Sequence, residues 1–155
     1  TYVESDTISR VEVQSWLAAN FSVTVIQYGG SLIAGTVDNN ASLNYAGAAS
    51  STGYYLTLDE DSNVNAKTCI KGTAIGGPTT LALGNVTWNS STSSGATIPA
   101  TPGDEMTTSY ATSQTSISPG DKDYYRFWMD VPSGQTPGDY ETNITVNAVV
   151  AGSSC

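Results

Sequence analysis

Acidic side chains gather in three short groups, which are the first residues to consider for chemistry. The groups are Asp59, Glu60 and Asp61; Asp104 and Glu105; and Asp121 and Asp123. A glycosidase needs two carboxyl groups held about 5–10 Å apart across a cleft. Neighbouring side chains on polar turns diverge and stay in solvent, so these groups are not expected to form such a pair. The chain also has no histidine, which removes Ser–His and Cys–His nucleophilic pairs and disfavours zinc and copper sites. We therefore expect neither an enzyme nor a cofactor.

Residues 59–65 place oxygen-bearing side chains at every second position, as calcium loops do. The calcium candidates are Asp59, Asp61 and Asn63. The segment lacks the central glycine and the terminal glutamate of the helix–loop–helix type of calcium loop. The alternative is a turn in which Asp and Asn side chains bond to nearby backbone N–H groups.

Cys69 and Cys155 are the two cysteines of the chain. Strand alternation places Cys69 on the outer face of its segment, and Cys155 ends a Gly-Ser-Ser tail that can reach it. A single bridge suits a secreted protein, and closing so long a loop would stabilise the fold by about 3–5 kcal/mol. We expect the bridge to be intramolecular, with an intermolecular bridge as the alternative.

The chain contains Asn-X-Ser/Thr sequons at Asn20, Asn40, Asn85, Asn89 and Asn143. A sequence rich in Asn, Ser and Thr produces some of these by chance. However, Asn20 lies opposite Phe21 in the alternation and Asn143 lies opposite Ile144, so both are expected to point outward, where a glycan can be attached. N-glycans are therefore predicted as covalent partners.

The length of 155 residues suits one domain, and the net charge of −9 makes nucleic acid and anionic lipid surfaces improbable partners. Only 12% of the residues are charged, and polarity comes from Ser, Thr, Asn and Gly, as in many secreted β-proteins. No stretch approaches the roughly 18 apolar residues of a membrane span. Because the chain starts at Thr1, we expect a mature extracellular form whose signal peptide has been removed.

Short segments of alternating apolar and polar residues, separated by turn residues, predict an all-β fold. No segment shows the apolar spacing of an amphipathic helix. We therefore predict a single antiparallel β-sandwich over residues 14–155, immunoglobulin-like or jelly-roll in type. The expected strands are residues 21–28, 31–37, 54–58, 64–70, 81–83, 106–110 and 113–118.

Two further strands, residues 124–131 and 140–150, are predicted to pair as a hairpin joined by a Pro/Gly turn. Its inner face, which would be the core that accepts an added strand, is predicted to be Phe127, Met129, Ile144 and Val146. Trp128 is expected on the outer face. An outward row of aromatic residues could instead bind sugar rings, as in a secreted monomeric carbohydrate-binding or adhesion module. The aromatic residues concerned are Tyr54, Tyr55, Tyr124, Tyr125, Phe127, Trp128 and Tyr140.

Residues 1–13 form an extended polar segment that is too weakly apolar to build a core of its own. One interpretation is a first strand of the same domain. The other interpretation is a donor strand that completes the sandwich of a neighbouring copy. If such head-to-tail contacts do not close into a ring, they generate a filament. The apolar residues that would enter the neighbour are Val3, Ile8, Val11 and Val13, although Ile8 differs from the others in parity.

Residues 63–72, 83–88, 125–140 and 144–146 resemble segments of secreted β-sandwich proteins of prokaryotes, especially archaea. In size and layout the chain is also similar to glycosylated subunits of archaeal extracellular filaments that assemble by donor-strand complementation. That resemblance implies a structural subunit of a pilus-like fibre at the cell surface, with copies of itself as its partners. The apolar N-terminal helix of type IV pilins is missing.

Overall fold

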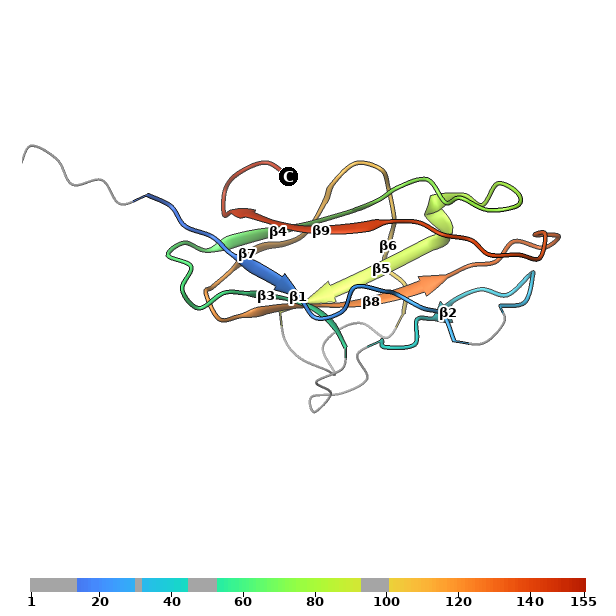
Figure 1. Cartoon of the computed structure of the whole chain (residues 1–155), viewed down its shortest axis with the longest axis horizontal. Coiled ribbons are helices and arrows are strands. Elements are labelled where there is room, and N and C mark those ends of the chain that lie inside the picture. Colours follow the sequence, from blue (N-terminus) through green and yellow to red (C-terminus); the bar gives the residue numbers. More distant parts are fainter. Residues whose placement is uncertain (1–13, 30–31, 45–52, 93–100) are drawn as a thin grey trace, which may run out of the picture.

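The computed structural model describes residues 14–29, 32–44, 53–92 and 101–155. These residues form two antiparallel sheets that lie face to face (Figure 1), which confirms the predicted β-sandwich. Within them, helical structure is limited to one 3-10 turn, Leu83–Asn85. In the same ranges, no helix is long and apolar enough to cross a membrane.

The larger sheet has the order β1-β3-β8-β5-β6, with the short β2 also paired to β8. Its strands are β1 (Ala19–Phe21), β2 (Asn39–Asn40), β3 (Tyr54–Leu58), β5 (Val86–Ser91), β6 (Asp104–Glu105) and β8 (Lys122–Met129). β8 is the central strand, because β3 and β2 pair along one of its edges and β5 pairs along the other. Its last three side chains, from Phe127 to Met129, are all buried, so both faces of this strand are covered.

The smaller sheet consists of β7 (Ala111–Ile117), β4 (Ala66–Gly72) and β9 (Ile144–Val150), with β4 in the middle. β4 and β9 pair without interruption, from Ala66 opposite Val150 to Gly72 opposite Ile144. At Gly72, a side chain would lie 2.9 Å from both Leu83 and Met106, which explains the glycine at this buried position.

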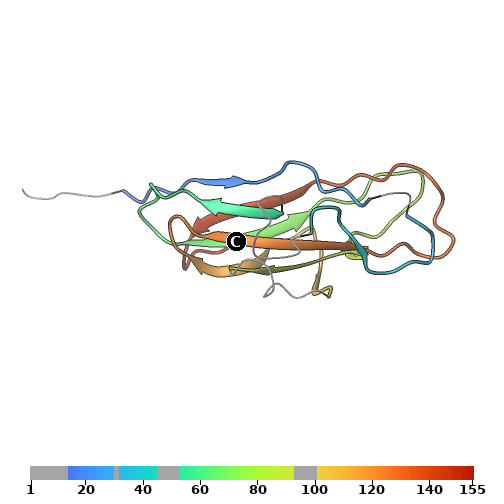
Figure 2. The same ribbon diagram turned by 90° about the horizontal axis from the view of Figure 1, so that it is seen from below.

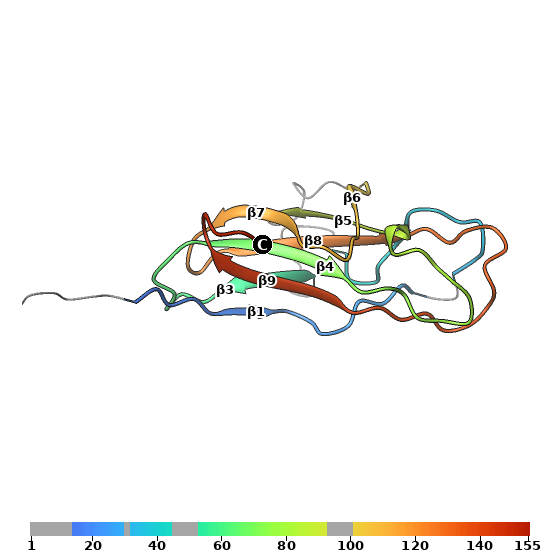
Figure 3. The same cartoon turned by 90° about the horizontal axis from the view of Figure 1, so that it is seen from above.

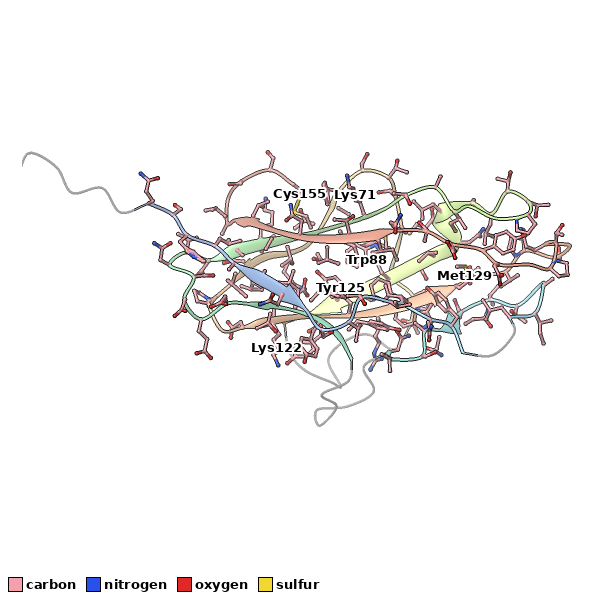
Figure 4. The ribbon with its side chains drawn as sticks, viewed as in Figure 1. Lys71, Trp88, Lys122, Tyr125, Met129 and Cys155 are labelled. Carbon is pink, nitrogen blue, oxygen red and sulfur yellow. A yellow bond between two sulfur atoms is a disulfide. The ribbon has the colours of Figure 1, made fainter. Side chains whose placement is uncertain are left out.

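The core lies between the sheets and is rich in aromatic rings. Tyr125 is fully buried, with ring centroids 6.0 Å from Phe21, 6.3 Å from Trp88 and 6.1 Å from Phe127. Figure 4 shows Tyr125 and Trp88 directed into the space between the sheets, whereas Lys122 points away from it. Burial of these large rings is the main apolar contribution to folding.

The predicted hairpin of residues 124–131 and 140–150 is wrong. β8 belongs to the larger sheet and β9 to the smaller sheet, and residues 130–143 cross from one to the other. This connection begins with a turn in which Gln135 N donates to Pro132 O (3.2 Å) and Gly134 has a φ of 82°. The alternation of apolar and polar residues predicts which side chains of a strand face a core. It does not show whether two strands pair within one sheet or face each other from two sheets, because the sequence pattern is the same in both cases.

The other expected strands differ mostly in length. Residues 54–58 form β3 as predicted, and residues 64–70, 113–118 and 124–131 correspond to β4, β7 and β8 with shifted ends. Residues 21–28 contribute only the end of β1 and a single bridge between Tyr28 and Ala41. Residues 32–37, 81–83 and 106–110 form no strand, whereas residues 30–31 lie outside the described ranges.

The predicted intramolecular disulfide joins Cys69 of β4 to Cys155 of the C-terminal tail, with an S–S distance of 2.07 Å. Cys69 lies on the outer face of β4, as alternation predicts, and is 1% exposed. Lys67 of the same strand donates from Nζ to the carbonyl oxygen of Ser153 and helps to hold the tail. The tail therefore lies against the outer face of the smaller sheet.

Replacing this bridge should lower the stability of the fold substantially. The cysteines are 86 residues apart, so Cys155→Ser frees a long loop in the unfolded chain and should lower the free energy of unfolding by about 3–5 kcal/mol. Urea unfolding of the oxidised chain and of the variant measures this difference. Wild-type chain unfolded under reducing conditions is the control and should match the variant. Equal urea midpoints for the oxidised chain and the variant would show that the bridge does not stabilise the fold.

Candidate functional site

The two long sides of the sandwich differ in how the sheets meet. On one side β5 and β7 are joined by hydrogen bonds, because Gln114 Nε2 donates to Ser90 Oγ (3.1 Å) and Ser90 Oγ donates to Ser113 O (3.3 Å). On the other side lie β9 and β1 (Figure 3). In the part of the chain that the structure describes, β1 pairs with β3 alone and β9 pairs with β4 alone. This second side therefore presents two unpaired strand edges.

A surface hollow with a volume of about 410 Å³ lies between these two strands. We call it the β1–β9 groove, and it is lined by Leu17, Ala19, Asn20, Phe21, Leu56, Val146, Asn147 and Ala148. Six of these residues are apolar. Figure 2 shows β1 at the margin of the larger sheet beside β3, which is the position from which it borders the groove.

The inner side chains of β9 are incompletely covered. Ile144, Val146 and Ala148 are all half-buried, although they face the core. On the neighbouring β4, the inner side chains of Ala66, Thr68 and Ile70 are at most 1% exposed. Both strands belong to one sheet and face the same larger sheet, so the difference comes from the missing neighbour beyond β9. Apolar side chains that are only half-buried beside a free strand edge favour the addition of a further strand.

The segment that leads into β1 is held against the turn between β3 and β4. Trp16 N donates to Asn63 Oδ1 (2.7 Å), and Asn63 Nδ2 donates to the carbonyl oxygen of Gln14 (2.9 Å). Asp59 N donates to the carbonyl oxygen of Ala18 (2.9 Å). These bonds fix the place from which residues 1–13 leave the domain. Residues 1–13 themselves, with Val3, Ile8, Val11 and Val13, lie outside the described residues.

The calcium candidates serve as turn residues in this structure. Asp59 Oδ1 accepts from Asp61 N (2.9 Å), which is the Asx-type turn considered as the alternative. The side-chain amide of Asn63 bonds to the backbone of residues 14 and 16. Among the described residues, no three His, Cys, Asp or Glu side chains gather as a metal site would need.

The four predicted acceptor residues do not form one site. Phe127 is 0% exposed and Met129 is 8% exposed, because both are covered by the core of their own chain. Val146 lines the β1–β9 groove, and Ile144 lies two residues before it on the same strand. The open part of the core is thus on β9, and β8 does not contribute to it. Sequence reasoning missed Leu17, Ala19 and Phe21 as the facing wall.

Most of the aromatic residues considered for sugar binding are buried. Tyr54, Tyr125, Phe127 and Trp128 are at most 1% exposed, so Trp128, which was expected on the outer face, is covered by its own chain and is not open to a sugar. Tyr140 is half-buried and lies so close to Gly77 that a side chain there would come within 2.3 Å of its ring.

The outer face of the larger sheet keeps one aromatic pair. Tyr55 and Tyr124 are tilted against each other with centroids 5.7 Å apart, and Lys122 Nζ lies 4.4 Å from the ring centroid of Tyr55. Both tyrosines are half-buried. In the described ranges, the aromatic residues predicted as a sugar platform therefore contribute a single pair to this face and no continuous row.

The sequon asparagines separate into two groups by exposure. Asn20, Asn40 and Asn143 are exposed, and the first and last of these point outward as predicted. Asn85 and Asn89 are half-buried. Asn89 Nδ2 also donates to the carbonyl oxygen of Thr101 (3.4 Å), so this side chain is partly engaged within the fold. The exposed three are the better acceptors for a bulky glycan.

Asp123, predicted to stay in solvent, is instead 0% exposed at the centre of a polar cluster between the sheets. Its Oδ2 accepts from Thr68 Oγ1 (2.6 Å), from Ser113 Oγ (2.9 Å) and from the Tyr125 hydroxyl. Oδ1 has no hydrogen-bond partner among the described residues. Burial raises the pKa of Asp123 above its usual value, and the hydrogen bonds from the hydroxyls offset part of that rise.

This cluster links β8 of the larger sheet to β4 and β7 of the smaller sheet. One signal in the sequence could have found it, because Asp123 shares the parity of Tyr125 and Phe127 on the same strand. The cluster is enclosed within the core, so it acts on the stability of the sandwich and does not form a surface site.

Comparison with known proteins found no matching family model, no similar curated protein and no similar solved structure.

Proposed function

We propose that this chain is a non-enzymatic structural subunit of an extracellular, pilus-like filament. Each subunit donates residues 1–13 to the sandwich of the next, and the copies join head to tail. Such a contact does not close on itself, so it continues into a fibre.

The observation that carries this proposal is the open side of the sandwich at the β1–β9 groove. There, Val146 and Ala148 are half-buried core side chains next to an unpaired strand edge. Exposed edges of this kind are usually blunted in natural proteins, because they pair unselectively with other chains. A strand supplied by a second copy would cover the apolar side chains and pair the edge in a single step.

The remaining features suit a fibre outside the cell. The Cys69–Cys155 bridge favours an oxidising compartment. We place N-glycans on Asn20, Asn40 and Asn143, which are exposed, ahead of Asn85 and Asn89. Intact mass, followed by mapping of glycopeptides, measures this occupancy. An unmodified mass for the native material would remove the glycan coat from the proposal.

The second candidate, a monomeric carbohydrate-binding or adhesion module, draws less support. Its recognition surface would be the aromatic residues, four of which are buried in the core. It predicts monodisperse native material that binds to a glycan array.

Negative-stain electron microscopy tests the filament directly. Native material should show fibres, and the chain lacking residues 1–13 should show none, because it retains the acceptor groove but has nothing to donate. The Cys155→Ser chain is a matched control for general destabilisation and should still assemble. Fibres from the truncated chain would refute strand donation by this segment.

A further inference from the structure

We infer that residues 1–13 of a neighbouring copy add to the free edge of β9, antiparallel to it, with their odd-numbered side chains facing the β1–β9 groove. This inference rests on the proposed filament function and specifies its interface. It chooses one of the two open edges, a direction for the added strand, and the face of that strand that is buried.

Every second residue of β9 directs its backbone N–H and C=O groups toward the free edge of the strand, where a new strand can bond to them. At one end Thr73 N donates to Asn143 O (2.9 Å), and beyond the other end Ala151 N donates to Asn65 O (2.9 Å). Hydrogen-bonded positions alternate along an antiparallel pair, so the odd-numbered residues of β9 bond to β4. The even-numbered residues therefore direct their N–H and C=O groups away from β4. They are Ile144, Val146, Ala148 and Val150, although the carbonyl oxygen of Val150 already accepts from Ser153 N (3.0 Å).

β9 is a better template than β1. It has seven residues in register, whereas β1 has three. Three of the even-numbered residues that offer their backbone on β9, Ile144, Val146 and Ala148, also carry half-buried inner side chains, so one added strand would pair the edge and cover the core together. Thirteen extended residues reach about 43 Å, and the seven of β9 span about 23 Å, so the donor is long enough to cover β9 and still connect to its own domain.

The direction follows from the place where each chain leaves its domain. β1 and β9 run in opposite directions (Figure 1), so Gln14 lies at the end of the sandwich where β9 finishes with Val150. That end is occupied by the chain's own residues 14–18, which are bonded to the turn at residues 59–63. A neighbour must therefore approach the opposite end, where β9 begins with Ile144. Its donor then enters with residue 13 nearest Ile144 and runs antiparallel to β9.

The same geometry separates donation from self-complementation. To fill its own groove, a chain would have to reverse direction near residues 13–14 and would pair parallel to β9. No glycine or proline occurs between Thr1 and Trp16 to make such a reversal easy. Parallel pairing is also slightly weaker per residue.

The two faces of the donor segment differ sharply in charge. The even-numbered residues include every charged side chain of the segment: Glu4, Asp6, Arg10 and Glu12. The odd-numbered residues are all uncharged and mostly β-branched: Thr1, Val3, Ser5, Thr7, Ser9, Val11 and Val13. Burying an unpaired charge is costly, so the odd face must enter the groove, and Ile8 then points outward. On the outer face of the same sheet, β4 presents Lys67 and Lys71, whose charge complements the acidic face of the donor.

One pair of substitutions in the full chain tests the buried face. Val11→Asp places a charge on the odd face and should abolish fibres, whereas Ile8→Asp makes a closely similar change on the even face and should leave fibre formation within about twofold of wild type. Both changes lie outside the described domain, and circular dichroism checks that each variant is folded. If Ile8→Asp abolishes fibres and Val11→Asp does not, the choice of buried face is wrong. The choice is also wrong if both variants form fibres as the unmodified chain does. If the unmodified chain forms no fibres, it is the filament function itself that fails.

Cysteine pairs test the edge and the direction. In an antiparallel pair, opposed inner side chains lie close enough for a disulfide. The doubly substituted chain Val13→Cys with Ile144→Cys should therefore give a ladder of covalent oligomers on a non-reducing gel, and Val13→Cys with Val150→Cys should give little. A ladder from the second pair alone would mean parallel addition. Fibres without a ladder from either pair would place the donor away from β9, even though the filament function stands.

Discussion

A tryptophan in place of Ala148 should stop fibre formation while the subunit stays folded. Ala148 lines the β1–β9 groove and is half-buried, so a large ring at this position would occupy space that the donor strand needs. Fully burying one valine contributes about 1.5–3 kcal/mol, so excluding even one donor valine should raise the chain concentration needed for fibres by about 10-fold or more. Electron microscopy across a dilution series measures that threshold.

Val149→Trp is the matched control for this substitution. Val149 lies on the same strand with its side chain on the outer face, so the ring does not reach the groove, and the change leaves the sequon at Asn143 intact. This variant should assemble at the wild-type threshold. Fibres from Ala148→Trp at the wild-type concentration would show that the groove does not receive the donor.

Asparagine in place of Asp123 should change how stability depends on pH. The folded state raises the pKa of Asp123 by burial, and so favours the protonated acid. The stabilisation is therefore fully present below the unfolded pKa of about 3.9 and is lost as the pH rises through the raised folded pKa. Within that window the wild-type free energy of unfolding should fall with rising pH by up to about 1.4 kcal/mol per unit from this group. The side-chain amide of the Asp123→Asn variant stays neutral at every pH, so this contribution disappears.

Urea unfolding of both chains between pH 3 and pH 8 measures this difference. Tyr125 is the titratable group among the side chains that bond to Asp123, and burial raises its pKa well above the ordinary value, so it stays neutral over this range. The variant should gain stability relative to wild type as the pH rises. Parallel pH profiles would show that Asp123 titrates equally in the folded and unfolded states.

Strand alternation predicted the faces of this fold well. It placed Cys69 on the outer face of its strand and Asn143 in solvent, and the structure agrees in both cases. These results depend on local chemistry, because the side-chain period of a strand is the same whichever strand lies beside it. The sandwich class and the disulfide followed from the same pattern.

The pairing of strands could not be predicted in the same way. β8 and β9 both alternate correctly, but they lie in different sheets, because residues 130–143 are long enough to cross between the sheets. The acceptor surface changed as a result. Phe127 and Met129 are closed core, and the open positions are Val146 and Ala148 on an edge that only the topology reveals. Asp123 was missed because its neighbours in sequence suggested a polar turn, whereas its parity pointed inward.

Hydrogen exchange along β9 tests the central claim most directly. Fibres are exchanged in D₂O, dissolved and read by NMR, and the Val11→Asp chain serves as the monomeric reference. The amides of Thr145, Asn147 and Val149 bond to β4 and should be protected in both samples. Those of Val146 and Ala148 should exchange freely in the monomer and become protected in the fibre by at least about 100-fold. If these two amides exchange equally fast in the fibre and the monomer, no strand adds to β9 and the proposed mode of assembly is wrong.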